Sequence, residues 1–415
     1  MLKESIASKK FKWIYHKGPS SNKVVALIPQ YNELSKGNFI ERLSHFNAFA
    51  KLHSNILDVI LIDDGSNNSS LQVMKWFVND NPGSFNVAAV TPNTDKIGAL
   101  YMTVLNVDHD YVLFSDFDTD LEHLELLPET LKEFENDPQL MGCYFRMLPM
   151  KRSSSIVKYQ EFEYAIHRKW YEYTSTEGSV AVMPGAGSLY KREILQQILP
   201  FHSGIRNGED RETTAMGIDL GYKAIYQKRI LAFTRTPESL KALIAQRVRW
   251  NLGYIETLSK EKRYYLRKIR SLTRIGFRSF FDIPSVLVLL LFPFIMLSLL
   301  VINFKIGLIA IAGAYLAKLA WVYFISKIGK SEIDSEKTPY LVLLSYPILK
   351  LFIEFPSWAI ASYKFLITDY GSREAAKHPE QVDVNGQVSD VTIKSLHFQK
   401  KGVSAKNHKE EKTLN

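Results

Sequence analysis

The sequence predicts an α/β domain with a mostly parallel sheet, followed by apolar helices that reach a membrane. Short apolar runs, often β-branched, alternate with helix-like segments in the first part of the chain, and long uncharged stretches come later. Continuous apolar strands separated by helices are typical of a parallel sheet that is covered on both faces. The 46% hydrophobic content of the 415-residue chain averages over these two regions and hides the difference between them.

Strands are expected where apolar runs end in turn residues. Helices are expected between them, at Phe39–His53, Leu71–Asn79 and Ile97–Val107. Because ligands bind at the carboxyl ends of such strands, the polar loops that follow the strands mark the predicted site. The predicted strands are Val24–Ile28, Val59–Ile62, Val87–Val90 and Tyr111–Phe114, and the polar loops are Gln30–Glu33, Asp63–Ser66 and Asp116–Asp120.

Composition also predicts where the parts of the chain begin and end. The change from mixed to strongly apolar and back to polar residues sets these boundaries. We expect an N-terminal segment over 1–22, the α/β domain over 23–235, interfacial amphipathic helices over 236–280, a transmembrane region over 281–368 and a polar, disordered tail over 369–415.

The net charge of +9 would suit nucleic acid, an anionic membrane surface or a phosphorylated ligand. No run of Lys and Arg interleaved with aromatic residues marks a nucleic-acid groove, so we expect no nucleic-acid partner. Basic residues gather instead at Lys260–Arg278 and Lys327–Lys330, beside the apolar stretches. Membrane proteins keep their cytoplasmic charge in this position, so the lipid bilayer is the expected partner.

Cysteine content and the N-terminus narrow the class of protein further. Cys143 is the only cysteine, which excludes an intrachain disulfide and a cysteine-based metal site. The first residues contain no apolar stretch of the kind found in a signal peptide. We therefore expect the α/β domain to remain in the cytosol.

Three apolar segments are candidates for membrane crossing. Ile283–Asn303 carries no charge and is long enough to span, and Ile306–Ile325 is interrupted only by Lys318. Pro339–Leu366 contains internal prolines and charges, so a kinked span, a re-entrant hairpin and an interfacial helix stay open. Buried helices of a soluble protein are the alternative for all of these segments. We expect a multi-pass protein of the cell (inner or plasma) membrane, while the basic tail leaves the number of crossings open.

The string Asp116-Phe117-Asp118 follows a predicted strand directly. Two carboxylates at this spacing can bind a hard cation, Mg²⁺ or Mn²⁺, and through it a diphosphate. A solvated acidic turn is the alternative. Asp120 is expected to cap a following helix, Leu121–Leu127.

Two further acidic strings have a functional and a local structural interpretation. Asp63 and Asp64 could bond a nucleotide base or ribose, or form a turn that caps the next helix. Glu209 and Asp210 could supply a general base that deprotonates an acceptor hydroxyl. Their alternative is an acidic first turn that complements the helix dipole.

The string from Gln246 to Trp250 lies on a helix expected over Glu238–Leu258. Gln246, Arg249 and Trp250 share one face at about 100° per residue, so an amide, a guanidinium and an indole lie together. A guanidinium suits a diphosphate and an indole suits a sugar ring. The alternative is a set of basic residues that snorkel from an interfacial helix, and Arg247 is expected to do only that. The opposite face is an apolar stripe formed by Leu240, Ile244, Val248, Leu252 and Ile255.

In their order along the chain these strings resemble the motifs of family 2 glycosyltransferases, the inverting group with a GT-A fold (Rossmann-like, with a mostly parallel sheet). The similarity is to the processive membrane branch that includes cellulose, chitin and hyaluronan synthases. The motifs that carry it are Pro29-Gln30-Tyr31-Asn32-Glu33, Asp63-Asp64-Gly65-Ser66, Lys96-Ile97-Gly98-Ala99-Leu100, Asp116-Phe117-Asp118, Glu209-Asp210 and Gln246-Arg247-Val248-Arg249-Trp250.

The resemblance implies a role for each matching residue. Asp210 would be the base, with Glu209 beside it, and Trp250 would lie beneath the acceptor. Asp118, with Asp116, would hold the metal. The nucleotide sugar would be bound by Tyr31, Glu33, Asp63, Asp64, Lys96, Asp116, Gln246 and Arg249. The donor implied is UDP-glucose or UDP-N-acetylglucosamine, and the product is a growing β-linked glycan.

The sequence departs from the family pattern in two of these motifs. Gln30 stands where a small residue is usual, and Phe117 where Ala or Gly is common. Two other functions stay open: a non-processive transferase that adds one sugar to a polyprenyl phosphate, and an inactive membrane transport or scaffold protein. Whether the chain needs an oligomer or an export partner is also open.

Overall fold

The computed structural model describes residues 1–83, 85–150, 154–328 and 340–368. These residues divide into two compact units, one drawn from 1–147 and 178–234 and the other from 148–177 and 235–368. Residues 148–177, which we expected within the α/β domain, therefore group with the later helices. The tail expected over 369–415 and residue 339 of the third apolar segment lie outside the described residues.

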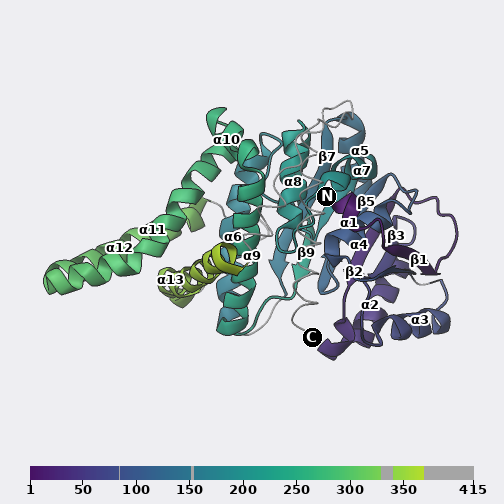
Figure 1. Ribbon diagram of the computed structural model, residues 1–415, viewed down its shortest axis with the longest axis horizontal. Helices are drawn as coiled ribbons and strands as arrows, with labels where there is room; N and C mark the ends of the chain where they lie inside the picture. The colour runs from purple at the N-terminus through teal and green to yellow at the C-terminus, as the bar shows by residue number, and fades with distance from the viewer. Residues whose placement is uncertain (84, 151–153, 329–339, 369–415) are drawn as a thin grey trace, which may run out of the picture. The chain divides into compact units, whose positions relative to one another are not determined.

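The first unit is built on a mixed sheet. Its strands are β1 (Lys10–Tyr15), β2 (Val24–Gln30), β3 (Leu57–Asp63), β4 (Asn86–Thr91), β5 (Tyr111–Phe114), β6 (Thr119–Glu122), β7 (Leu140–Pro149), β8 (Ser188–Lys191) and β9 (Lys223–Thr234). The described residues form nine strands in the order β1-β4-β3-β2-β5-β8-β7-β9-β6. Figure 1 labels β1, β2, β3, β5, β7 and β9 of this sheet. β2 pairs in parallel with β3 and β5, and β3 pairs in parallel with β4. These are the strands that the apolar runs predict.

Both faces of the parallel strands are buried, which explains why their sequences are continuously apolar. On one face, Ala26 and Leu61 belong to a core that also contains Phe46 and Phe77. Phe46 lies on α2 (Phe39–Leu52) and Phe77 on α3 (Ser70–Asp80). The intervening residues of the strands, such as Leu27, are equally buried on the other face, and α4 (Asp95–Val104) contacts β2. The other helical elements of the unit are α1 (Leu2–Ser5), η1 (Glu33–Lys36), η2 (Leu124–Leu126), α5 (Leu127–Asn136), α7 (Arg192–Ile198), η3 (Leu199–Phe201) and α8 (Glu209–Asp219).

Two local features differ from the sequence-based expectation. Strand β1, which lies before residue 23, joins the sheet by antiparallel pairing with β4. The prediction of a helix over Leu121–Leu127 is wrong. Strand β6 occupies Thr119–Glu122 and pairs antiparallel with β9, and α5 begins only at Leu127. Burial in β6 alternates from residue to residue, as a strand requires. Asp120 therefore lies within a strand and caps no helix.

The second unit is helical in its described residues. It contains α6 (Ser155–Ser175), α9 (Leu240–Lys260), α10 (Lys262–Arg270), α11 (Arg274–Ile302), α12 (Phe304–Ile328), α13 (Tyr340–Tyr363) and a π-helical turn over Lys364–Thr368. Ser154, Ser239 and Thr273 cap α6, α9 and α11 by accepting backbone N–H groups of the first turn. Tyr159 of α6 and Leu243 of α9 share a core with Tyr346 and Ile353 of α13.

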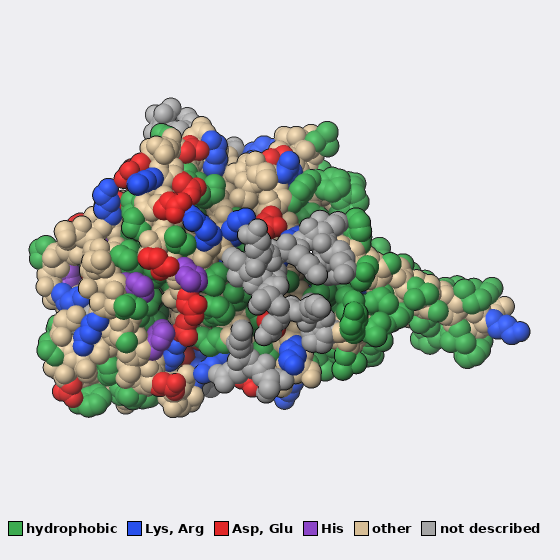
Figure 2. All heavy atoms as spheres, turned by 180° about the vertical axis from the view of Figure 1, so that it is seen from behind, with side chains coloured by type: hydrophobic (Ala, Val, Ile, Leu, Met, Phe, Trp, Pro, Cys, Tyr) green, Lys and Arg blue, Asp and Glu red, His purple; other side chains and the backbone are tan. Residues whose placement is uncertain are grey.

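Three of these helical stretches are long and apolar enough to cross a membrane: Arg274–Ile302, Phe304–Phe324 and Tyr340–Ile367. They correspond to the three segments expected from hydropathy. The third includes α13, which carries Pro347 and Pro356 inside the helix. Hydrophobic side chains cover the surface of α11 and α12 in Figure 2. Their exposure, for example at Leu287 and Phe294, is the arrangement that lipid contact requires.

The turn after β3 yields a prediction about stability. Gly65 has φ +67°, and a Cβ added there would lie 2.5 Å from the backbone nitrogen of Asn93. Gly65→Ala should therefore lower the free energy of unfolding by roughly 3 kcal/mol, from backbone strain and the clash together. Thermal unfolding of the purified chain in detergent measures this.

Gly221→Ala is the matched control, because Gly221 has φ +91° but nothing within 4 Å of the added Cβ. It should cost only the strain, about 1 kcal/mol. Equal losses in the two variants would contradict the close packing of Gly65 against the backbone of Asn93.

Candidate active site

The carboxyl ends of β2, β3 and β5 meet at one edge of the sheet, because β2 pairs in parallel with both of the others. Gln30 stands opposite Asp63 in the register. A cleft of about 250 Å³ opens at this edge. Its lining is Pro29, Gln30, Tyr31, Glu33, Asp64, Lys96, Asp116, Phe117 and Asp118. The structure thus brings together most of the residues for which the sequence predicts nucleotide-sugar or metal contact.

Asp63 is not part of this lining. Its side chain is 1% exposed, and its carboxylate accepts a hydrogen bond from the Ser66 backbone N–H at 3.1 Å and another from the Gln30 amide. These bonds fix the turn that carries Asp64. Contact between Asp63 and a nucleotide stays a prediction.

Asp64 reaches the cleft from a buried position. Its Oδ1 accepts hydrogen bonds from Thr94 N at 2.8 Å and Thr94 Oγ1 at 2.7 Å, and its Oδ2 accepts one from Asn93 Nδ2 at 2.9 Å. Burial raises the pKa of Asp64 to about 6, although the bonds from Thr94 oppose this. Sequence reasoning missed Asn93 and Thr94, because neither stands in a recognisable motif.

The ammonium group of Lys96 lies between Asp116 of the cleft lining and Glu209 beside the cleft. Lys96 Nζ lies 2.5 Å from Asp116 Oδ1 and 3.7 Å from Glu209 Oε1. Burial would lower the pKa of Lys96, but the charges of Asp116 and Glu209 outweigh it and raise this pKa. A Cβ at Gly185 would come within 2.6 Å of Nζ, so glycine at position 185 leaves room for the ammonium group.

Asp118 has the environment of a cation ligand. Burial and the nearby charge of Asp116 raise the pKa of Asp118 to about 6. The negative charge of the Asp118 carboxylate is therefore not fully balanced by positive charge from the protein. Among the described residues, no group of three or more His, Cys, Asp or Glu could enclose a metal ion. A pair of carboxylates does fit Mg²⁺ or Mn²⁺ when substrate phosphates and water supply the remaining oxygens. Asp116 and Asp118 are such a pair.

A guanidinium that the sequence did not single out holds the loop after β5. Arg42 of α2 donates to Phe117 O at 2.9 Å, to Thr119 O at 3.0 Å and to Asp120 Oδ1 at 2.6 Å. His45 Nε2 also lies 3.1 Å from Asp120 Oδ1. Asp120 therefore pairs with α2, which is the physical reason that its predicted role as a helix cap is wrong.

Glu209 and Asp210 form the first turn of α8, next to the cleft residue Lys96. Asp210 Oδ1 accepts a hydrogen bond from Arg211 N at 2.8 Å, and Oδ2 accepts one from Gly185 N at 3.4 Å. Burial raises the pKa of Glu209 to about 7, against the opposing effect of Lys96. An acidic residue with a raised pKa beside a cleft is typical of proton-transfer sites.

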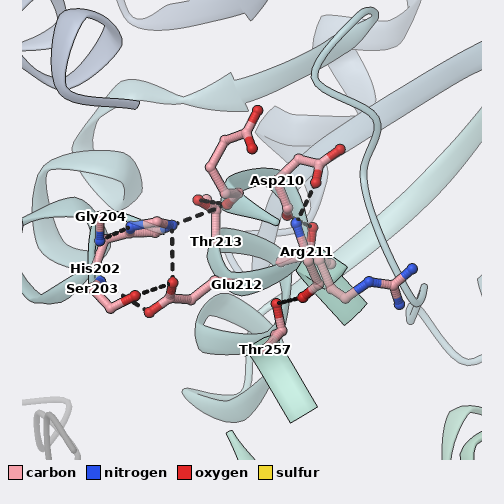
Figure 3. Close-up of polar contacts among 11 residues, drawn as sticks. His202, Ser203, Gly204, Asp210, Arg211, Glu212, Thr213 and Thr257 are labelled. Carbon is pink, nitrogen blue, oxygen red and sulfur yellow. Dashed lines mark hydrogen bonds and ion pairs between the residues drawn. The ribbon is translucent and has the colours of Figure 1, made fainter. Parts of the chain in front are cut away.

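A buried cluster holds this helix end in place (Figure 3). His202 Nδ1 accepts from Gly204 N at 2.9 Å, so Nε2 carries the proton and donates to Glu209 O at 3.0 Å. Glu212 accepts from Ser203 N at 2.9 Å and from Ser203 Oγ at 2.5 Å. The backbone of the acidic turn is therefore fixed by this cluster, while the side chain of Asp210 points away from it (Figure 3).

The predicted residues Gln246, Arg249 and Trp250 lie on α9, in the second unit. Arg249 and Trp250 are exposed, and Gln246 is half-buried. The apolar stripe is confirmed only in part, because Val248 and Leu252 are buried while Leu240 is 40% exposed. The expectation that Arg247 snorkels is wrong. It is 3% exposed because Glu163 of α6 supplies a buried counter-charge.

Carboxylates at the carboxyl ends of the parallel strands, with an acidic helix start beside them, stand where open α/β sheets bind their ligands. The chain belongs to the family described as Glycosyltransferase like family 2, whose family model matches residues 22–253. This confirms the resemblance drawn from the motifs.

Two relatives and one solved structure extend the comparison. The poly-beta-1,6-N-acetyl-D-glucosamine synthases of Staphylococcus epidermidis and Staphylococcus aureus (strain COL) are 24% identical over 209 and 205 residues. These matches cover 49% of this chain and 49% of each relative, so the chain spans about half the length of the curated relatives it matches. A mannosyltransferase from Pyrobaculum calidifontis, solved in complex with GDP-Man and Mn²⁺, has a TM-score of 0.50 at 16% identity, covering 88% of this chain and 92% of that chain. The likeness of fold confirms the predicted GT-A-like architecture.

The bonds of Arg42 predict an effect on the loop that carries Asp116 and Asp118. Arg42→Met removes the donors to Phe117 O and Thr119 O and leaves both carbonyls without them. We expect about 2 kcal/mol less stability and a raised KM for the nucleotide sugar. Thermal unfolding and donor titration measure the two effects.

Asp120→Asn is the control, because it keeps the bonds from Arg42 to both carbonyl groups. It should leave the KM for the donor close to that of the unmodified chain. An Arg42→Met variant with unchanged stability and unchanged donor KM would show that the loop holds its shape without the guanidinium.

Proposed function

We propose that this chain is a membrane-bound inverting glycosyltransferase that transfers a sugar from a nucleotide donor to a growing β-linked polysaccharide. The proposed donor is UDP-linked, with N-acetylglucosamine or glucose as the sugar, and the reaction is proposed to be processive. The observation that carries the proposal is the convergence of Asp64, Lys96, Asp116 and Asp118 in one cleft, with Glu209 within 3.7 Å of Lys96. The name of the staphylococcal relatives supports N-acetylglucosamine as the sugar.

In this proposal the nucleotide lies over the carboxyl ends of β2 and β3. Tyr31, Glu33 and Asp64 line that side of the cleft. Asp64 is held by Thr94 and Asn93, so its carboxylate is already oriented when the donor arrives. A preoriented acceptor loses less freedom on binding a ribose or base than a mobile one does.

Asp116 and Asp118 are the proposed ligands of a divalent cation, and Lys96 lies beside them. A bound Mg²⁺ or Mn²⁺ would neutralise charge on the diphosphate leaving group. Lys96 contributes positive charge to the same end of the donor. Asp116 and Lys96 already lie in contact, so both can face the diphosphate together.

The proposed transfer is a single displacement at the anomeric carbon. Asp210 accepts the proton of an acceptor hydroxyl, whose oxygen forms a bond to the anomeric carbon from the face opposite the diphosphate. The bond between that carbon and the diphosphate oxygen breaks, and the electron pair leaves with the nucleoside diphosphate. The configuration is inverted, so an α-linked donor gives a β-linkage. Glu209 holds Lys96 beside the base.

The acceptor and membrane parts of the proposal rest on the second unit. Arg249 is proposed to contact the diphosphate, Gln246 the donor, and Trp250 to stack beneath the terminal sugar of the acceptor. The exposure of Arg249 and Trp250 supports these roles. The three apolar helices support a multi-pass protein, and the basic residues before α11 support a cytosolic catalytic domain.

Substitution of the base yields a direct test of the mechanism. Asp210→Asn should reduce transfer by about 10²–10⁴-fold, because the amide cannot accept the proton. Donor binding should persist, since Asp210 is not part of the cleft lining. Turnover of labelled sugar nucleotide and donor binding by titration measure the two quantities.

Asp219→Asn is the matched control, because it makes the same exchange at the opposite end of α8. It should keep full activity. Turnover by Asp210→Asn at the rate of the unmodified chain would remove Asp210 as the base.

The function as a whole is tested with a panel of radiolabelled nucleotide sugars. Membranes containing the chain are incubated with UDP-N-acetylglucosamine, UDP-glucose or GDP-mannose, and the products are sized and digested with linkage-specific glycosidases. We expect a polymer from a UDP-sugar, lost in EDTA and restored by Mn²⁺ or Mg²⁺. A single lipid-linked sugar would identify a non-processive transferase, and no metal-dependent turnover of any donor would favour a transport or scaffold protein.

A further inference from the structure

A network of buried charges lies inside the second unit, and the mechanism proposed above does not use it. Glu163 of α6 is 0% exposed and is paired with the guanidinium of Arg247 on α9. Lys350 of α13 lies 2.5 Å from the other carboxylate oxygen of Glu163 and 2.8 Å from Glu354. Burial would raise the pKa of Glu163, but the two cations outweigh it and lower this pKa. The carboxylate is therefore ionised and joins three helices.

Arg247 also contacts both ends of the motif that surrounds it. Its guanidinium carbon lies 4.1 Å from the centroid of the Trp250 ring, within the range of a cation–π contact. Its Nη1 donates to Gln246 Oε1 at 2.9 Å. Through this one side chain, the buried charges reach the half-buried Gln246 and the exposed Trp250.

The contact covers one face of an indole that is otherwise accessible. Trp250 is 42% exposed, although Arg247 lies over its ring. A sugar ring stacks on an indole through its apolar face, and stacking depends on how the indole is oriented. A guanidinium that is fixed by Glu163 holds the ring in one orientation and leaves its other face for a ligand.

We propose that Arg247 is a positioning residue that orients Trp250 for the acceptor sugar, and that Glu163 and Lys350 hold Arg247 in place. The proposal rests on the proposed function, because it takes Trp250 as the acceptor platform. It adds that the orientation of this platform depends on α13, a helix long and apolar enough to cross a membrane. The planar guanidinium is required, since an ammonium can pair with Glu163 but cannot lie flat on the ring.

Arg247→Lys tests the positioning role while it keeps a positive charge beside Glu163. We expect the dissociation constant of a short β-linked N-acetylglucosamine oligosaccharide to rise about tenfold. The polymer should become shorter, while the KM for the nucleotide sugar should change much less than the acceptor affinity, because Arg247 reaches the proposed donor contacts only through its bond to Gln246. A general structural defect would change the donor KM and the acceptor affinity together, so this difference separates the two explanations.

A spectroscopic measurement reports on Trp250 without any turnover. The fluorescence emission of Trp250 is obtained by subtracting the spectrum of a Trp250→Phe chain from the spectrum of the same chain with Trp250 present. This difference is measured once with Arg247 in place and once with the Arg247→Lys exchange. We expect this difference spectrum to shift when the guanidinium is lost. If the unmodified chain transfers no sugar, the proposed function fails, but the difference spectrum still decides whether Arg247 positions Trp250.

Arg274→Lys is the matched control, because Arg274 lies 4.8 Å from the ring of Tyr173 in the same unit. The same exchange there should change neither acceptor affinity nor Trp250 emission. The positioning role is overturned if Arg247→Lys leaves acceptor affinity, polymer length and Trp250 emission as they are in the unmodified chain.

Lys350→Met tests the link to α13 separately. It removes one cation from Glu163 and leaves the pair with Arg247, so we expect a smaller change of the same kind in acceptor affinity and Trp250 emission. Lys305→Met on α12 is the control, because Lys305 is an exposed lysine in another apolar helix. A Lys350→Met variant identical to the Lys305→Met variant would limit the positioning role to Arg247 and Glu163.

Discussion

Parallel pairing of β2 with β3 and β5 is the constraint on which the first unit depends. Parallel strands end at the same edge of a sheet, so the loops that follow them lie together. Gln30 and Asp63 are the last residues of β2 and β3, Asp116 follows β5, and these strands are buried on both faces. A core of Phe and Leu side chains fixes the strands, so the carboxylates meet without any sequence proximity.

The polar groups behind the cleft show how this edge is stabilised. Arg42 satisfies two backbone carbonyls and the carboxylate of Asp120, and His202 fixes the first turn of α8 through a backbone carbonyl. Arg42 holds the loop after β5 from a distant segment, and His202 holds the start of α8 from seven residues earlier in the chain. Buried polar groups need partners, and here the partners also set the position of the functional side chains.

Much of this could be predicted from the sequence, because it depends on local pattern. Apolar runs predicted β2 to β5, and the residues just after them predicted the cleft lining. Arg42 could not be predicted, because its role depends on which segments the fold brings together, and no motif in the sequence marks His202 as the partner of Glu209 O. The alternating burial of β6 was not recognised, because Asp120 before an apolar stretch resembles the start of a capped helix. The prediction that Arg247 snorkels was wrong because its buried counter-charge, Glu163, lies 84 residues away in the sequence.

The charge of the cleft lining has a thermodynamic consequence. Its acidic side chains outnumber its basic ones, with Glu33, Asp64, Asp116 and Asp118 against Lys96. An anion that enters alone meets net repulsion, and Lys96 is already engaged by Asp116. Any anionic ligand is therefore held only together with added positive charge, whether that charge arrives as an ion or on basic side chains. Binding of the anion and binding of the positive charge are then linked: each ligand raises the affinity of the cleft for the other by the same factor.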